Sequence, residues 1–237
     1  MTAPVLVACS HGTRSPAGRA AIRRIVDDIR ALRPELDVRP AHVDVEAPAV
    51  ADVVSAALTG PGGGAGPVPG VVVVPLLLST GVHVRHDIGA AVRAPRAAAA
   101  RHLGPDERLV DVLHERLTEV DVGPGDAVVL AAAGSSDPSA RHDVEQVHAW
   151  LAQRHSGPVT VGYCAASGPS VPEAVAQARA GGATRVVLAS YLLAPGFFHS
   201  LLSGAGADAV TAPLAPHPLL AHIALDRYEE RARRPQP

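Results

Sequence analysis

The chain has 237 residues, enough for one large domain or two half-size ones. Its net charge of −2 gives no support for nucleic acid as a partner, and because all 21 basic residues are arginines, lysine-dependent phosphate loops and Schiff-base chemistry are excluded. The longest apolar run, residues 71–78, is far shorter than the ~20 residues of a membrane span, and the N-terminus lacks a signal-peptide pattern. We therefore expect a cytoplasmic protein with no membrane partner.

The first predicted element is a buried strand, Val5–Cys9, which ends in a turn that carries His11. Gly12 lets the backbone turn tightly, and Ser15-Pro16 is typical of a helix N-cap followed by proline at the first helical position. In an open parallel α/β sheet, ligands bind where strands end at their carboxyl termini. His11 and Arg14 are therefore predicted to lie at the mouth of a site.

Apolar spacing predicts the next elements of this first part of the chain. In order they are a helix that starts at Pro16 and ends before Pro34, a strand at 38–45, a helix at 48–58, a strand at 71–78, helical or mixed structure at 91–101 and an amphipathic helix at 109–120. The second strand is predicted to bring His42 and Asp44 to one face. The third ends in another loop with a histidine, His83.

The pattern then restarts, which indicates a degenerate internal duplication with halves 1–122 and 123–237. Strands are predicted at 127–132, 159–164 and 186–193, and helices at 143–151 and after Pro172. The backbone signals recur, but polar side chains do not: Ala133 stands for His11, Ala165 for Asp44 and Phe198 for His83. This loss in one copy predicts one active half and one supporting half.

His11 and His83 are the strongest candidates for chemistry, because both follow predicted parallel strands. Two imidazoles with a carboxylate such as Asp44 suit a divalent transition metal, and a histidine also accepts protons near neutral pH. The residues alone leave other readings open: each histidine could bond locally within its loop, and Asp44 could cap the following helix. Arg14 and Arg85 could grip substrate carboxylates or be surface arginines.

Two further groups of residues carry weaker predictions. Tyr191, Phe197 and Phe198 could form an apolar wall for a flat ligand, although core or dimer packing is the simpler interpretation. Cys9 and Cys164 end apolar runs and are predicted to be buried thiols rather than a disulfide.

Four segments together resemble a known family, the sirohydrochlorin chelatases of the class II chelatase superfamily. In order and spacing these are Ser-His-Gly-Thr-Arg (10–14), Val-Asp-Val-Glu-Ala-Pro (43–48), Val-Pro-Leu-Leu-Leu-Ser-Thr-Gly-Val-His-Val-Arg-His-Asp-Ile (74–88) and Leu-Gly-Pro (103–105). The second half is similar to the family's duplicated form, so the resemblance covers nearly the whole chain.

The resemblance implies an α/β fold of two tandem flavodoxin-like parallel-sheet halves facing a central cleft. It implies an ATP-independent lyase that inserts Co²⁺ or Fe²⁺ into sirohydrochlorin for cobalamin or sirohaem, with the metal as substrate and no permanently bound cofactor. His11 and His83 would be catalytic, and the metal would be held by them and by Asp44, where many members have glutamate. Substrate contacts would come from residues of the two strand-end loops, namely Ser10, Arg14, Ser79, Thr80, Gly81, Val82 and Arg85.

Other functions remain open on the sequence. The first alternative is a non-catalytic tetrapyrrole or metal carrier, and a weaker one is a phosphohydrolase that uses His11. The sequence does not choose between cobalt and iron, because imidazole and carboxylate ligands accept both. It is compatible with a monomer or a homodimer.

Overall fold

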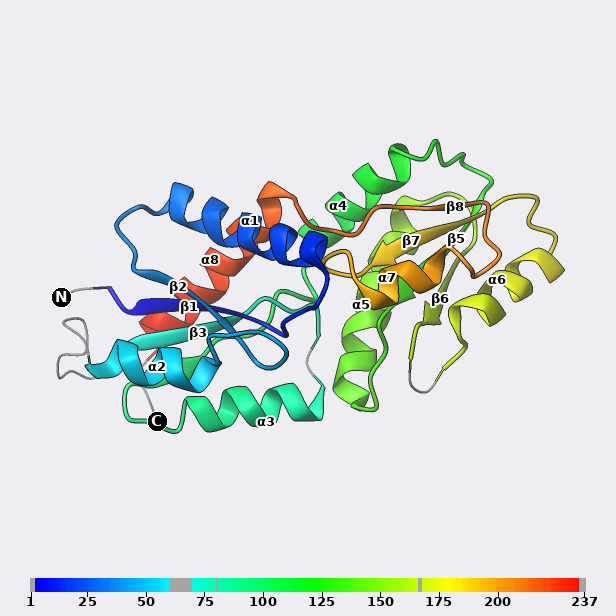
Figure 1. Ribbon diagram of the computed structural model, residues 1–237. Coiled ribbons are helices and arrows are strands. Elements are labelled where there is room, and N and C mark those ends of the chain that lie inside the picture. Colours follow the sequence, from blue (N-terminus) through cyan, green and yellow to red (C-terminus); the bar gives the residue numbers. More distant parts are fainter. Residues whose placement is uncertain (1–2, 60–69, 80, 166–167, 235–237) are drawn as a thin grey trace. The chain divides into compact units, whose positions relative to one another are not determined.

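The structure is a computed structural model that describes residues 3–59, 70–79, 81–165 and 168–234, and of Val82 and His83 only the backbone. The chain forms two compact units (Figure 1). Unit 1 comprises Met1–Leu103 and Pro218–Pro237, and unit 2 comprises Gly104–His217. Each unit is an α/β layer structure around its own parallel sheet, which confirms the predicted fold class.

The sheet of unit 1 has the strand order β2-β1-β3-β4. Its strands are β1 (Val5–Ser10), β2 (Val38–His42), β3 (Val71–Pro75) and β4 (Ala97–Ala99). All pairings are parallel, with Leu6 opposite Val38 and Val5 opposite Val71. The loops after β1, β2 and β3 therefore meet at one carboxyl edge, with the β1 loop in the middle.

Helices cover both faces of this sheet, which explains why β1 and β3 are buried along their whole length. The helices are α1 (Pro16–Leu32), α2 (Val50–Thr59), α3 (Val82–Ala91) and α8 (Pro218–Arg233). Helices α1 and α8 pack together on one face, and α2 and α3 on the other. Helix α1 starts as predicted, with the Ser15 hydroxyl accepting from the Gly18 N–H and proline at the first position.

Unit 2 repeats this arrangement with the strand order β6-β5-β7-β8. The strands are β5 (Ala127–Ala132), β6 (Val159–Tyr163), β7 (Val186–Tyr191) and β8 (Ala209–Val210), and the helices are α4 (Glu107–Thr118), α5 (Pro138–Arg154), α6 (Val171–Ala180) and α7 (Phe197–Leu202). Helices α4 and α5 pack together on one face of the sheet, and α6 packs on the other with Leu202 of α7.

The compact units do not coincide with the predicted halves 1–122 and 123–237. Helix α4 follows the first sheet in the chain but packs on β7 and α5, and helix α8 follows the second sheet but packs on β3 and α1. Each unit thus receives one helix from the other repeat. Apolar periodicity identifies the face that a helix buries but not the sheet that receives it, so the exchange lies outside what the pattern predicts.

Three predicted segments differ in extent from the structure. Strand β2 ends at His42, so Asp44 does not share a strand face with it, and β3 ends at Pro75 rather than at residue 78. The segment 91–101, predicted as helical or mixed, contains the edge strand β4. Three alanines carry no periodic signal, and only pairing with Val71–Val73 makes them a strand.

Candidate metal and substrate site

The turn after β1 presents the His11 side chain to solvent. His11 is exposed, and no side chain or backbone group in the described part of the chain bonds to its imidazole. Gly12 has φ 93°, and a Cβ at this position would collide with the carbonyl oxygen of Asp44. Only glycine therefore allows the His11 turn to approach the loop after β2 so closely.

That close approach joins two of the predicted metal ligands through their backbones. The Asp44 N–H donates to the His11 carbonyl at 2.9 Å, and the Val43 N–H donates to the Ser10 carbonyl at 2.9 Å. Asp44 is exposed and its carboxylate accepts the Val45 N–H at 2.7 Å, so it does not cap the following helix. The structure thus brings His11 and Asp44 together on adjacent loops.

Beside the turn lies a cluster of buried and half-buried polar groups. Ser10, predicted to bind substrate, is only 3% exposed, and its Oγ lies 2.8 Å from His42 Nδ1. The Glu46 carboxylate accepts the Thr13 N–H at 2.7 Å and pairs with Arg19 Nε at 2.9 Å. Glu46 is a site residue that the sequence patterns do not identify, although it follows Asp44 by two residues in the same motif.

The loop after β3 holds the remaining predicted site residues. Gly81 caps α3 in an extended conformation, and the backbones of Val82 and His83 form its first turn. Thr80 and the side chains of Val82 and His83 lie outside the described residues, so the role of His83 stays a prediction. Ser79 is half-buried, and Arg14, Arg85 and His86 are exposed.

Unit 2 has the same backbone without the polar side chains. The Ala165 N–H donates to the Ala133 carbonyl at 2.9 Å, as Asp44 does to His11, and Gly134 has φ 86°. Gly196 caps α7 as Gly81 caps α3, which aligns Phe198 with His83. The predicted equivalences of the two repeats are therefore confirmed at these turns.

The structure separates the predicted aromatic wall and distinguishes the two thiols. Tyr191 is 2% exposed, whereas Phe197 is 73% and Phe198 36% exposed, so only the phenylalanines could face a ligand. Cys9 is buried, and this burial raises its pKa to about 12. Cys164 is only half-buried, contrary to prediction, because it lies beyond the end of β6.

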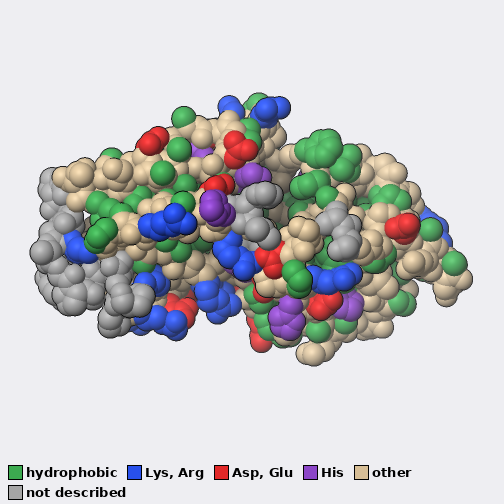
Figure 2. All heavy atoms as spheres, turned by 90° about the horizontal axis from the view of Figure 1, so that it is seen from below, with side chains coloured by type: hydrophobic (Ala, Val, Ile, Leu, Met, Phe, Trp, Pro, Cys, Tyr) green, Lys and Arg blue, Asp and Glu red, His purple; other side chains and the backbone are tan. Residues whose placement is uncertain are grey.

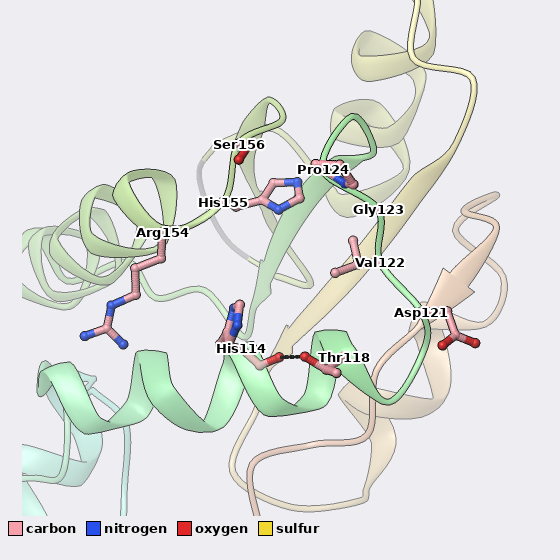
Figure 3. Close-up of a pocket in the computed structure, with 9 residues that line it drawn as sticks. All are labelled: His114, Thr118, Asp121, Val122, Gly123, Pro124, Arg154, His155 and Ser156. Atoms are coloured by element: carbon pink, nitrogen blue, oxygen red, sulfur yellow. Dashed lines mark hydrogen bonds between the residues drawn. The ribbon is translucent and has the colours of Figure 1, made fainter.

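A separate surface pocket of about 490 Å³ lies in unit 2 (Figure 3). His114 and Thr118 of α4 line it together with His155, whose Nε2 lies 2.8 Å from the Asp126 carbonyl. Arg154 at its rim is paired with Asp111. None of the predicted site residues lines this pocket, so it is distinct from the candidate site.

Charge on the surface is mixed in sign. On the face drawn in Figure 2, arginine and acidic side chains are interspersed, and histidines lie among them. Among the side chains that the structure describes, no three His, Cys, Asp or Glu residues gather to hold a metal ion. In the described helices, none combines the length and the apolar character needed to span a bilayer.

Comparisons with known proteins agree with the repeats seen in the sequence. The model of the CbiX family matches twice, at residues 5–120 and 127–231. A sirohydrochlorin ferrochelatase of Priestia megaterium is 33% identical over 136 residues, which cover 53% of this chain and 51% of that protein. The chain thus matches about half the length of this curated relative, and the resemblance noted from the sequence is confirmed.

Two solved structures share the fold over nearly the whole chain. SirB from Bacillus subtilis, solved with Fe³⁺, has a TM-score of 0.80 at 21% identity, covering 98% of this chain and 96% of that one. The sirohydrochlorin chelatase SirB from Bacillus subtilis subspecies spizizenii, in complex with cobalt, has a TM-score of 0.75 at 20% identity, covering 97% and 95%. At this level of identity the likeness establishes the fold alone.

Proposed function

We propose, since this chain belongs to the CbiX family, that it is an ATP-independent lyase that inserts a divalent metal ion into sirohydrochlorin. The observation that carries the proposal is the exposed imidazole of His11, without a partner among the described residues, held beside Asp44 at the carboxyl edge of the sheet. This edge is where open α/β sheets bind ligands.

The chemistry of insertion matches what these groups can do. A metal ion must lose part of its hydration shell and pass to the ring nitrogens, while the pyrrole N–H protons leave. A neutral imidazole is a ligand for Co²⁺ and Fe²⁺ and is also a proton acceptor near neutral pH, so His11 suits both tasks. Its exposure lets metal and macrocycle reach it without unfolding the turn.

Asp44 and Arg14 suit supporting roles in the same reaction. The Asp44 carboxylate is exposed close to the His11 turn, where its charge would attract a cation. Arg14 is exposed and has no partner among the described residues, so its guanidinium is available for a carboxylate of the substrate. His83, the second residue of α3, is proposed as the second imidazole.

Metal in this proposal is a substrate, delivered to the macrocycle and released with it, and no resident cofactor is invoked. Cobalt and iron are both compatible with an imidazole–carboxylate pair. We also propose that the protein is cytoplasmic and that it acts as a monomer or a homodimer.

The test is an anaerobic insertion assay with sirohydrochlorin and either Co²⁺ or Fe²⁺, followed by the change in tetrapyrrole absorbance. Repeated turnover at sub-stoichiometric protein, well above the spontaneous rate, is the expected result. Tight binding of the macrocycle without turnover would contradict the enzyme and favour the carrier. Hydrolysis of phosphate esters without any effect on sirohydrochlorin would favour the phosphohydrolase.

A further inference from the structure

The His11 turn and the bend at Asp44 are held together by Glu46. Its side chain is only 14% exposed, and its two carboxylate oxygens have separate partners. One accepts the Thr13 N–H at 2.7 Å, and the other pairs with Arg19 Nε at 2.9 Å. Arg19 Nε also donates to the Thr13 carbonyl at 2.9 Å, so the carboxylate, the turn and the start of α1 form one closed network.

The bend that Glu46 anchors is strained. Val45 has φ 67°, the left-handed region that a β-branched residue rarely adopts, and its side chain is 44% exposed. Backbone in this region costs about 1–3 kcal/mol and persists only where the surroundings hold it. Two local bonds close the bend, from the Glu46 N–H to the Asp44 carbonyl and from the Val45 N–H to the Asp44 carboxylate, both at 2.7 Å. The Glu46 carboxylate and the Asp44-to-His11 backbone bond attach this bend to the His11 turn.

Among its described residues, unit 2 has different side chains at the positions equivalent to Arg19, His42 and Ser10. Arg141 is the equivalent of Arg19, and its guanidinium lies 5.9 Å above the ring of Tyr163, which stands where unit 1 has His42. Ala132 replaces Ser10. Unit 1, which carries the histidines, therefore has a partly buried polar network at this turn. Among the described residues of unit 2, the equivalent arginine lies over an aromatic ring instead.

We propose that Glu46 is a positioning residue that locks the His11 turn to the strained Asp44–Glu46 bend and so sets the separation between the His11 imidazole and the Asp44 carboxylate. This role rests on the proposed function, because the separation of these two groups matters for activity only if both act in metal insertion. In this role Glu46 acts through its contacts with Thr13 and Arg19 and not by direct contact with metal or macrocycle.

The variants Glu46→Gln and Glu46→Ala test the proposal in a graded way. Glutamine keeps one acceptor for the Thr13 N–H but loses the charge that pairs with Arg19, whereas alanine loses both contacts. We expect kcat for metal insertion to fall about tenfold or more in Glu46→Ala and less in Glu46→Gln, with little change in KM for sirohydrochlorin. The matched control is Glu229→Gln, which removes an ion pair with Arg33 at the far end of α1 and should stay within twofold.

A second substitution that relieves the strain at Val45 should restore activity to Glu46→Ala. A purely structural role of Glu46 would not predict this rescue. Glycine adopts positive φ freely, so Val45→Gly removes the force that would open the bend once Glu46 is lost. The double variant Val45→Gly/Glu46→Ala should therefore recover part of the lost kcat, with Val45→Gly alone as its reference. A double variant no faster than Glu46→Ala would overturn the part of the proposal that concerns strain.

Amide hydrogen exchange separates this inference from the proposed function. The Asp44 N–H bonds to the His11 carbonyl and not to Glu46, so its exchange reports the position of the bend. We expect it to exchange about tenfold faster in Glu46→Ala than in wild type or Glu229→Gln, even if the wild-type protein proves to have no insertion activity. The positioning role would be overturned if the Asp44 amide exchanged as slowly in Glu46→Ala as in wild type. It would also be overturned if Glu46→Ala inserted metal at a rate within twofold of an active wild type.

Discussion

The two units of this chain have closely similar turns with different side chains. In both, a glycine with positive φ lets the turn after the first strand bond to the loop after the second, through Asp44-to-His11 in unit 1 and Ala165-to-Ala133 in unit 2. Unit 1 places an exposed imidazole and carboxylate on this backbone; unit 2 places two alanines. The same backbone therefore carries different side chains in the two units, and the proposal assigns the chemistry to unit 1 on its side chains alone.

The largest expected effect concerns the second imidazole. His83→Ala should lower the insertion rate by about 100-fold or more, because a proton acceptor and a metal ligand are lost together. His86→Ala, an exposed histidine on the same helix, is the matched control and should leave the rate unchanged. Equal rates for His83→Ala and wild type would remove His83 from the site and leave unit 1 with His11 alone.

Substitution of Gly12 or Gly134 by alanine should destabilise the fold to a similar extent, but only the change at Gly12 should reduce metal insertion. Alanine at either position meets positive φ and a carbonyl of the neighbouring loop, so each variant should lose about 1–3 kcal/mol or more of unfolding free energy. Measured below both melting temperatures, insertion should fall in Gly12→Ala and persist in Gly134→Ala. The comparison of the units would fail if both variants lost activity equally.

The two cysteines give a smaller contrast that does not depend on function. Cys9 is fully buried with a pKa of about 12, whereas Cys164 is half-buried and its pKa is raised less strongly by burial. A thiol reagent at pH 8 should label Cys164 in the native protein at least about tenfold faster than Cys9, with the sites assigned by mass spectrometry. Faster labelling of Cys9 would mean that the strand β1 opens readily.

The smallest effect is a pH dependence confined to unit 2. The Gly123 N–H and then Arg185 hold the pKa of Asp126 below its ordinary value of 3.8. A lowered pKa stabilises the folded state above pH 3.8, and this contribution is lost as the pH falls below that value. Asp126→Asn should therefore melt slightly below wild type at pH 7, with the difference shrinking in acid. A difference in melting temperature that does not change with pH would mean that Asp126→Asn destabilises the protein through packing and not through charge.

Much of this arrangement could be predicted from local sequence patterns. Apolar runs located β1, β3, β5 and β7, and the Ser15-Pro16 cap located the start of α1. The turns at Gly12 and Gly134 could be predicted because a backbone with positive φ favours glycine, which is visible in the sequence. His11 was singled out for its place after a strand, and its exposure agrees with that choice.

What could not be predicted depends on contacts between distant segments. Helices α4 and α8 each pack on the sheet of the other repeat. Helical periodicity predicts which face of a helix is buried but not which sheet it packs on. Glu46 reaches Thr13 only because the β1–β2 register sets two loops side by side, and a sequence offers no direct sign of that pairing. Ser10 was predicted to face substrate, yet it is buried against His42, a partner on the neighbouring strand.

The most direct measurement is the initial rate of Co²⁺ insertion into sirohydrochlorin by His11→Ala, compared with wild type and with His114→Ala, an exposed histidine of unit 2. The account predicts a rate near the spontaneous one for His11→Ala, with folding and melting temperature unchanged, and a wild-type rate for His114→Ala. A His11→Ala protein that inserts metal as fast as wild type would contradict the assignment of the chemistry to the turn after β1.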